Sequence, residues 1–204
     1  MRPFRGRAAS FRPWVRLSAA LLAVVLTATG CVGRDAVSSA DSGGGYIAGS
    51  GALKRYPVGD RKAAPDVSGR TLDGTMLRLA DYRGRTLVVN FWASWCPPCR
   101  AENAALAQAS RDTKASGVAF LGVNFKEEAS QARIYSERQR TPYPSLLDRY
   151  GEVTVRFSPS VPPQSIPTTL VIDRQGRIAA SIFGEITYTR LMSLLRSVAA
   201  ERAT

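Results

Sequence analysis

Histidine is absent from this sequence of 204 residues, and only three cysteines are present. A zinc site needs about four ligands from Cys, His or carboxylates, and a copper-delivery site built on a cysteine pair adds a His. A c-type haem attachment motif also ends in His, whereas Arg100 follows the second cysteine of the close pair. The composition therefore argues against a resident metal and against covalent haem, and we expect no cofactor.

Long hydrophobic runs are scarce as well. The apolar stretch Leu17–Thr29 has 13 residues, which is short of the ~20 that a membrane-spanning helix needs. It follows a start with five arginines and no acid, and small residues precede Cys31. This combination is typical of a secretory signal. The start contains no pair of adjacent arginines, so it does not favour twin-arginine export.

Cys31 directly follows Ala28-Thr29-Gly30. This arrangement resembles the lipobox of bacterial lipoproteins, whose cysteine is lipid-modified and becomes the mature N-terminus. The resemblance implies that residues 1–30 are a lipoprotein-type signal peptide and that Cys31 anchors the chain to the extracytoplasmic face of a bacterial cell membrane. An uncleaved anchor and simple secretion are the alternatives. In that compartment disulfides are the default state, so a dithiol that stays reduced needs an electron supply.

Lysine is also rare, because arginine outnumbers it 24 to 4. The net charge of +12 falls to +7 once the five arginines of residues 1–30 are set aside, and the basic residues are scattered. A nucleic-acid groove would group them with aromatic residues, so we expect no nucleic-acid partner. A moderately basic surface instead favours attraction to an anionic membrane face.

Glycine and serine are concentrated in residues 31–57, for example in Ser38–Gly45 and Gly49–Gly51. Such runs behave as flexible coil, and ~25 residues have an r.m.s. span on the order of 25 to 30 Å. We therefore expect residues 31–57 to be a flexible linker attached to the lipid. Residues 58–204 contain no internal repeat and fit one domain with a single core.

The domain alternates strand-like and helix-like segments. Val67–Ser68 and Met76–Leu79 flank Asp73-Gly74, which predicts a hairpin. The other predicted elements are strand Thr86–Trp92, helix 97–115, strand Val118–Asn124, helix Glu127–Arg140, extended Ser145–Leu147, short helix Tyr150–Phe157, strands Thr168–Asp173 and Arg177–Phe183, and helix Tyr188–Glu201. The predicted core includes Phe91, Trp92, Leu121 and Val171. This order predicts an α/β fold with parallel strands early, an antiparallel hairpin late and helices on both faces.

Cys96 and Cys99 enclose two prolines and come directly after the apolar strand that ends at Trp92. Two thiols at this spacing, on a turn from strand to helix, can pass a disulfide to and from a partner protein. A purely structural disulfide is the alternative, although a four-residue loop constrains the unfolded chain little. The pattern therefore favours redox exchange.

These elements and motifs resemble the thioredoxin fold, and more narrowly the TlpA/ResA/CcmG family of membrane-anchored extracytoplasmic thiol-disulfide oxidoreductases. The resemblance covers Ala64–Val198. The motifs that carry it are Ala64-Pro65-Asp66, Leu79–Gly84, Val89–Glu102 with Trp-Cys-Pro-Pro-Cys inside it, and Ile166–Thr169. The resemblance implies a mixed central sheet flanked by helices on both faces, an N-terminal β-hairpin, and a helix-strand insert at Lys126–Leu147.

The position of Cys96 at a helix N-terminus predicts its role. Unpaired N–H groups and the helix dipole stabilise a thiolate there, and the thiolate is the attacking species. Cys99, one turn further and more buried, would resolve the mixed disulfide. Neither Pro97 nor Pro98 offers an N–H to the sulfur. We therefore expect Cys96 to be less acidic than in strongly oxidising relatives, so that the pair favours electron donation.

Glu102 lies three residues after Cys99 on the same predicted helix. A partly buried carboxyl there would relay the proton of Cys99, whereas the alternative is an ordinary acid in the first turns of a helix. Asn90 stands where cytoplasmic thioredoxins keep a buried Asp, and the resemblance implies Glu102 as its replacement.

The loop that faces the disulfide in this fold carries a cis proline, and the resemblance implies that Pro167 is this residue. A trans turn proline is the alternative. The backbone of Ile166 would then pair like a strand with the substrate segment around its cysteine. Trp95 would line the apolar rim where partners dock. The predicted docking residues are Trp95, Pro97, Pro98, Ile166 and Pro167.

The resemblance implies a protein-disulfide reductase that acts outside the bacterial membrane, and we expect a monomer. The implied substrates are exported cysteine-containing proteins such as apocytochrome c or proteins of copper-centre assembly. Electrons would come from a membrane thiol carrier of the DsbD/CcdA type. The alternatives are a thiol oxidase or disulfide isomerase, a peroxiredoxin-like enzyme, a copper-delivery protein, and a docking module without redox chemistry.

Overall fold

The computed structural model describes residues 51–158, 160–162 and 165–201. The predicted signal peptide, Cys31 and most of the predicted linker lie outside the described residues. In the described part of the chain, no helix is long and apolar enough to cross a membrane.

One sheet contains, in spatial order, β1 (Ala52–Arg55), β8 (Ile178–Phe183), β7 (Thr168–Ile172), β4 (Thr86–Trp92), β5 (Val118–Phe125) and β6 (Ser145–Asp148). A separate hairpin pairs β2 (Ser68–Arg70) with β3 (Met76–Arg78).

The six-stranded sheet is mixed. β4 is parallel to β5 and antiparallel to β7, and β5 is parallel to β6. The consecutive parallel strands are joined by α1 (Pro97–Thr113) and α2 (Ala129–Arg138), because parallel strands need a crossover connection. Every residue of β4 and β5 is buried, as expected for strands that are covered on both faces.

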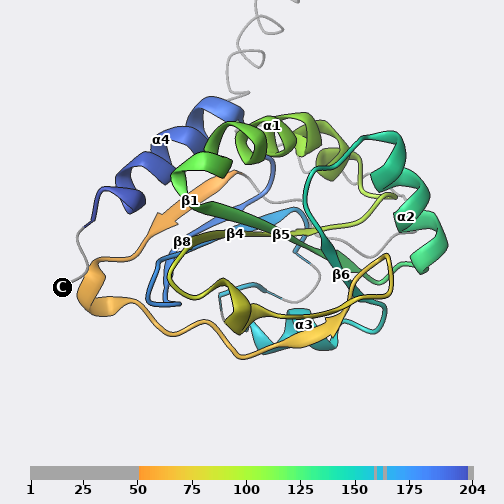
Figure 1. Ribbon diagram of the computed structural model, residues 1–204, viewed down its shortest axis with the longest axis horizontal. Coiled ribbons are helices and arrows are strands. Elements are labelled where there is room, and N and C mark those ends of the chain that lie inside the picture. The colour runs from red at the N-terminus through yellow and green to blue at the C-terminus, as the bar shows by residue number, and fades with distance from the viewer. Residues whose placement is uncertain (1–50, 159, 163–164, 202–204) are drawn as a thin grey trace, which may run out of the picture. The chain divides into compact units, whose positions relative to one another are not determined.

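The helices cover both faces of this sheet. α1 and α4 (Tyr188–Ala199) lie side by side on one face, whereas α3 (Glu152–Arg156) and the β2–β3 hairpin lie on the other (Figure 1). Successive side chains of a strand point to opposite faces, so Val88 packs with the α1 and α4 cluster while Val89 packs on the opposite side. The predicted thioredoxin-like α/β fold is confirmed.

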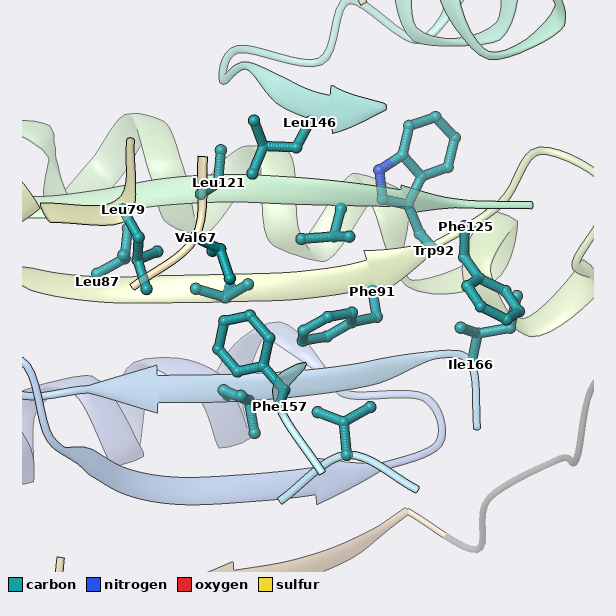
Figure 2. Close-up of a cluster of buried hydrophobic side chains, with 14 of the residues drawn as sticks. Val67, Leu79, Leu87, Phe91, Trp92, Leu121, Phe125, Leu146, Phe157 and Ile166 are labelled. Atoms are coloured by element: carbon teal, nitrogen blue, oxygen red, sulfur yellow. The ribbon is translucent and has the colours of Figure 1, made fainter. Parts of the chain in front are cut away.

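The core on the α3 side is built around two aromatic rings. Phe91 of β4 and Phe157, just after α3, meet edge to face with ring centroids 5.2 Å apart. Figure 2 shows these rings among the aliphatic side chains of the same cluster, with Ile166 at its edge. Trp92 is 7% exposed and belongs to this cluster, which confirms its predicted core position.

The predicted linker extends too far. Residues 52–55 were expected to be flexible, but they form β1, which pairs antiparallel with β8 from Ala52 opposite Phe183 to Arg55 opposite Ala180. Without β1, β8 would be an edge strand with unpaired backbone N–H and C=O groups. The predicted helix-strand insert, Lys126–Leu147, contains α2 and all of β6 except Asp148, and β6 extends the sheet beyond β5.

Candidate active site

The cysteine pair lies where β4 gives way to α1. Cys96 is the N-cap of the helix, and Pro97 and Pro98 occupy its first two positions, where a backbone N–H has no partner within the helix. Cys96 and Cys99 form a disulfide with their Cα atoms 5.3 Å apart. The strand, the turn and the proline-led helix start therefore hold the two sulfurs within bonding distance.

Both cysteines are buried in this disulfide form. Cys96 is 0% exposed and Cys99 is 4% exposed, so the prediction that Cys99 is the more buried of the two was wrong. The N-cap position explains the difference, because it directs Sγ of Cys96 at the first turn, where the N–H of Cys99 donates to it at 3.3 Å. Within the motif Pro97 is exposed, while Trp95 and Pro98 are half-buried.

Glu102 is buried beneath this helix start, at 1% exposure. Its Oε1 accepts a hydrogen bond from Nδ2 of Asn90 at 2.7 Å, and its Oε2 accepts one from the backbone N–H of Ile186 at 3.0 Å. The amide of Asn90 also donates to Oγ1 of Thr169 at 3.1 Å. The carboxyl therefore joins α1 to β4 and to the segment before α4.

Burial raises the pKa of Glu102 to about 8, although the hydrogen bonds from Asn90 and Ile186 favour the charged form and Glu185 disfavours it. Desolvation dominates because a charge is far more costly to bury than a neutral carboxyl. A group with this pKa holds its proton at neutral pH and can release or accept one there. Glu102 is thus fully buried, where partial burial was predicted.

The Ile166–Pro167 peptide bond is cis, as predicted. Both residues are buried, and the carbonyl oxygen of Pro167 accepts a 2.8 Å hydrogen bond from the N–H of Gly184. Within the described residues, neither the N–H nor the C=O of Ile166 has a hydrogen-bond partner. The docking roles of Trp95, Pro97, Pro98, Ile166 and Pro167 stay predictions.

A second buried carboxylate near the motif was missed at the level of sequence. Glu127 accepts hydrogen bonds from the backbone N–H of Ser94 at 3.0 Å, from the Ser94 hydroxyl, and from Nδ2 of Asn124 at 2.7 Å. These contacts fix the turn that precedes Cys96. The carboxyl ends of the parallel strands β4 and β5 meet at one edge of the sheet, so the polar residues after each strand were a usable signal.

The donor set for a metal is sparse. Across residues 51–158, 160–162 and 165–201, no three Cys, Asp or Glu side chains gather in a group that could hold an ion.

This chain is similar to known proteins both in sequence and in fold. The sequence profile of the AhpC/TSA family matches residues 61–181. Among characterised relatives, thiol-disulfide oxidoreductase ResA of Geobacillus thermodenitrificans is 33% identical over 135 residues, which cover 66% of this chain and 75% of that protein. Residues 61–181 include the strands from β2 to β7 and the pair Cys96 and Cys99.

Two solved structures have the same fold. A secreted thiol-disulfide isomerase from Corynebacterium glutamicum gives a TM-score of 0.69 at 29% identity and covers 73% of this chain and 92% of that chain. A DsbF homologue from Corynebacterium diphtheriae gives a TM-score of 0.68 at 27% identity and covers 75% of this chain and 99% of that chain.

Proposed function

This chain belongs to the AhpC/TSA family and is a thiol-disulfide oxidoreductase of the ResA type, and we propose that it reduces specific disulfides in exported proteins. The observation that carries the proposal is the environment of Cys96, which is the N-cap of a helix whose first two residues are prolines. The substrate class is an exported protein with a cysteine pair, such as apocytochrome c or a protein of copper-centre assembly.

The exchange has two steps. The Cys96 thiolate attacks one sulfur of the substrate disulfide, which forms a Cys96–substrate bond and releases the other substrate sulfur as a thiolate that takes a proton from solvent. Cys99 then gives its proton to the ionised fraction of Glu102 and attacks Sγ of Cys96. The intramolecular disulfide closes, and the second substrate sulfur leaves and is protonated. Two electrons and two protons pass from the dithiol to the substrate.

The helix start supports the reducing direction. In the first turn only the N–H of Cys99 reaches Sγ of Cys96, because Pro97 and Pro98 have none. Fewer N–H donors stabilise a thiolate less, and a less stable reduced form makes the pair a better electron donor.

The cis loop supports docking of an extended substrate segment. Strand addition requires a backbone N–H or C=O that has no internal partner, and Ile166 meets this condition within the described residues. The substrate segment around its cysteine would pair with Ile166, which belongs to the hydrophobic cluster against which the half-buried Trp95 packs.

The location is part of the proposal. We place the enzyme at the extracytoplasmic face of the membrane, anchored through a lipid on Cys31, with a membrane thiol carrier of the DsbD/CcdA type as electron donor. Cells grown with a labelled fatty acid should label the full chain, and Cys31→Ala should abolish the label, whereas Cys99→Ser should keep it. Equal labelling of Cys31→Ala would contradict the anchor.

Trapping tests the function directly. Cys99→Ser cannot complete the second step, so it should accumulate a mixed disulfide between Cys96 and the substrate protein. Cys96→Ser is the control, because it removes the attacking sulfur and should trap nothing. Mass spectrometry of the adduct would identify the substrate. Absence of any adduct on Cys99→Ser in cells that make the parent chain would contradict the proposal.

Disulfide isomerisation or thiol oxidation is the second candidate, since the structural neighbour from Corynebacterium glutamicum is described as an isomerase. The reduction potential separates the two functions. A reductase should have a potential near the ~−270 mV of thioredoxin, while a value near the ~−120 mV of strong periplasmic oxidants would favour the second candidate. Rapid turnover of peroxide without a partner protein would point instead to a peroxiredoxin-like enzyme.

A further inference from the structure

An open groove of about 390 Å³ lies beside the cysteine motif. Ser94 and Arg100 form the wall next to the motif, and Ile134, Tyr135 and Arg138 of α2 form the other wall. The N–H of Arg100 donates to the carbonyl oxygen of Cys96 at 3.2 Å. The groove therefore begins within one helical turn of the reactive cysteine.

Both walls are held on the sheet by buried contacts. On the motif side, Glu127 accepts hydrogen bonds from both the N–H and the hydroxyl of Ser94. On the α2 side, the ring of Tyr135 packs against Trp92 of β4 with centroids 5.5 Å apart. A ligand would thus meet a surface that is already formed, which lowers the cost of binding.

The groove carries positive charge. Arg100 and Arg138 are exposed, and neither has an ion-pair partner within the described residues. Among the described residues, no carboxylate lines the groove. The nearby carboxylate of Glu127 is 8% exposed and already accepts three hydrogen bonds. Two cations are therefore available to a ligand.

The same groove also offers apolar and neutral polar contacts. Ile134 is 44% exposed, which is a large exposed fraction for an aliphatic side chain on a short helix. The hydroxyl of Tyr135 has no hydrogen-bond partner among the described residues. A ligand that fits would combine carboxylates with an aliphatic side chain, as a polypeptide segment does.

We propose that this groove binds the segment of the substrate protein next to its reactive cysteine and selects segments that carry acidic residues beside an aliphatic one. This proposal rests on the thiol-disulfide exchange proposed above, and it specifies which class of substrate the same site accepts. Arginine suits this role because its planar guanidinium binds a carboxylate through two hydrogen bonds. Opposite charge also speeds the encounter of the two proteins.

Peptide disulfides test the selection. Three peptides, each a dimer of identical chains joined by the disulfide of a single cysteine, share one leucine and differ only in whether two positions flanking the cysteine are Glu, Gln or Lys. The protein is added in its dithiol form, so that Cys96 and Cys99 supply the two electrons and the second peptide chain leaves as a thiol. The parent protein should show a kcat/KM about tenfold higher for the Glu peptide than for the Gln peptide, from two partly exposed ion pairs. The double variant Arg100→Gln/Arg138→Gln should make the two values equal.

A matched control removes the same charge from exposed arginines outside the groove that have no ion-pair partner in the described part of the chain. Arg111→Gln/Arg196→Gln changes one such arginine on α1 and one on α4, and it should keep the preference. Survival of the preference in Arg100→Gln/Arg138→Gln, or its equal loss in the control, would overturn the proposal. So would a parent protein that does not distinguish Glu from Gln.

Two further outcomes separate this proposal from its alternatives. Thiol-disulfide exchange with the peptides is measured in both directions, reduction and oxidation. A protein that only oxidises the peptides would contradict the reductase function. A preference for the Glu peptide in that oxidation would still support the proposed groove. Binding of the full chain to anionic vesicles is measured alongside. If Arg100→Gln/Arg138→Gln weakens vesicle binding and leaves the peptide preference intact, the groove faces a membrane and the proposal fails.

Discussion

Asn90 of β4 donates a 2.7 Å hydrogen bond to Glu102 of α1, and both side chains are buried. The second carboxylate oxygen of Glu102 accepts the N–H of Ile186 at 3.0 Å. One helical turn separates Glu102 from Cys99, so a titratable carboxyl ties the redox helix to the sheet. The pKa of this carboxyl is raised to about 8 by burial, which couples the fold to pH in the physiological range.

Glu102→Gln should remove a pH dependence of stability. The folded chain keeps the Glu102 proton up to its pKa of about 8, whereas the unfolded chain releases it near 4.5. Between these values the unfolded state binds fewer protons, so the free energy of unfolding falls as pH rises, by a few kcal/mol. Urea unfolding of the disulfide form at several pH values measures this slope, because thiols then do not titrate.

The difference between the parent and Glu102→Gln isolates this carboxyl from all other groups. At pH 5 the variant should be about 1 kcal/mol less stable than the parent, because only one of the two N–H groups that donate to Glu102 keeps an acceptor oxygen. That deficit should shrink or reverse by pH 8.5. Parallel pH curves for the two proteins would show that Glu102 does not titrate in this window.

Asn90→Ala should raise the pKa of Glu102 further. The amide of Asn90 favours the ionised carboxyl, so its loss leaves desolvation less opposed. We also expect a loss of about 1–3 kcal/mol in stability from the broken buried hydrogen bonds. Carbon-13 NMR of the carboxyl measures the pKa, and Thr169→Val is the control, because it removes only the outer partner of Asn90. A pKa that stays at the parent value would contradict this account.

Glu127→Ala should loosen the turn before Cys96. It removes all three hydrogen bonds to Glu127 and leaves the N–H of Ser94 without its acceptor, with a cost of about 2–3 kcal/mol. Glu127→Gln can keep an acceptor for Ser94 and should cost less than about 1 kcal/mol. Amide hydrogen exchange at Ser94 should speed up in the first variant and not in the second. Equal protection in both would mean that other contacts hold the turn.

Gly122→Ala should disturb the contact between β4 and β6. A Cβ on Gly122 would overlap Oγ of Ser145 and lie 2.7 Å from Nε1 of Trp92, which are themselves hydrogen-bonded at 3.2 Å. Overpacking of this kind costs about 1–3 kcal/mol. Gly59→Ala is the control, since no atom of the described residues lies within 4 Å of its Cβ position, and it should change stability by less than about 0.5 kcal/mol. Thermal unfolding compares the two.

Sequence patterns identified the elements that carry strong local signals. β4 was predicted with its observed bounds, Thr86–Trp92, because a run of mostly β-branched, aliphatic and aromatic residues, interrupted only by Asn90, ends at the turn that leads to the cysteines. The motif Cys-Pro-Pro-Cys placed the helix start, because proline is tolerated only at its first positions. The cis peptide at Pro167 was also expected, from the resemblance to a known fold.

Tertiary contacts decided what local signals do not encode. β1 has four mostly exposed residues and no apolar alternation, and it is a strand only because β8 offers it an edge. Cys96 is buried as deeply as Cys99 because packing covers the N-cap. Glu102 meets the N–H of Ile186, 84 residues further along the chain, and Glu127 reaches back 33 residues to Ser94. Residue types and spacing therefore predicted the cysteine pair and the carboxyl of Glu102 beside it, whereas the burial of these groups and the raised pKa of Glu102 depend on long-range contacts that form only when the sheet and helices assemble.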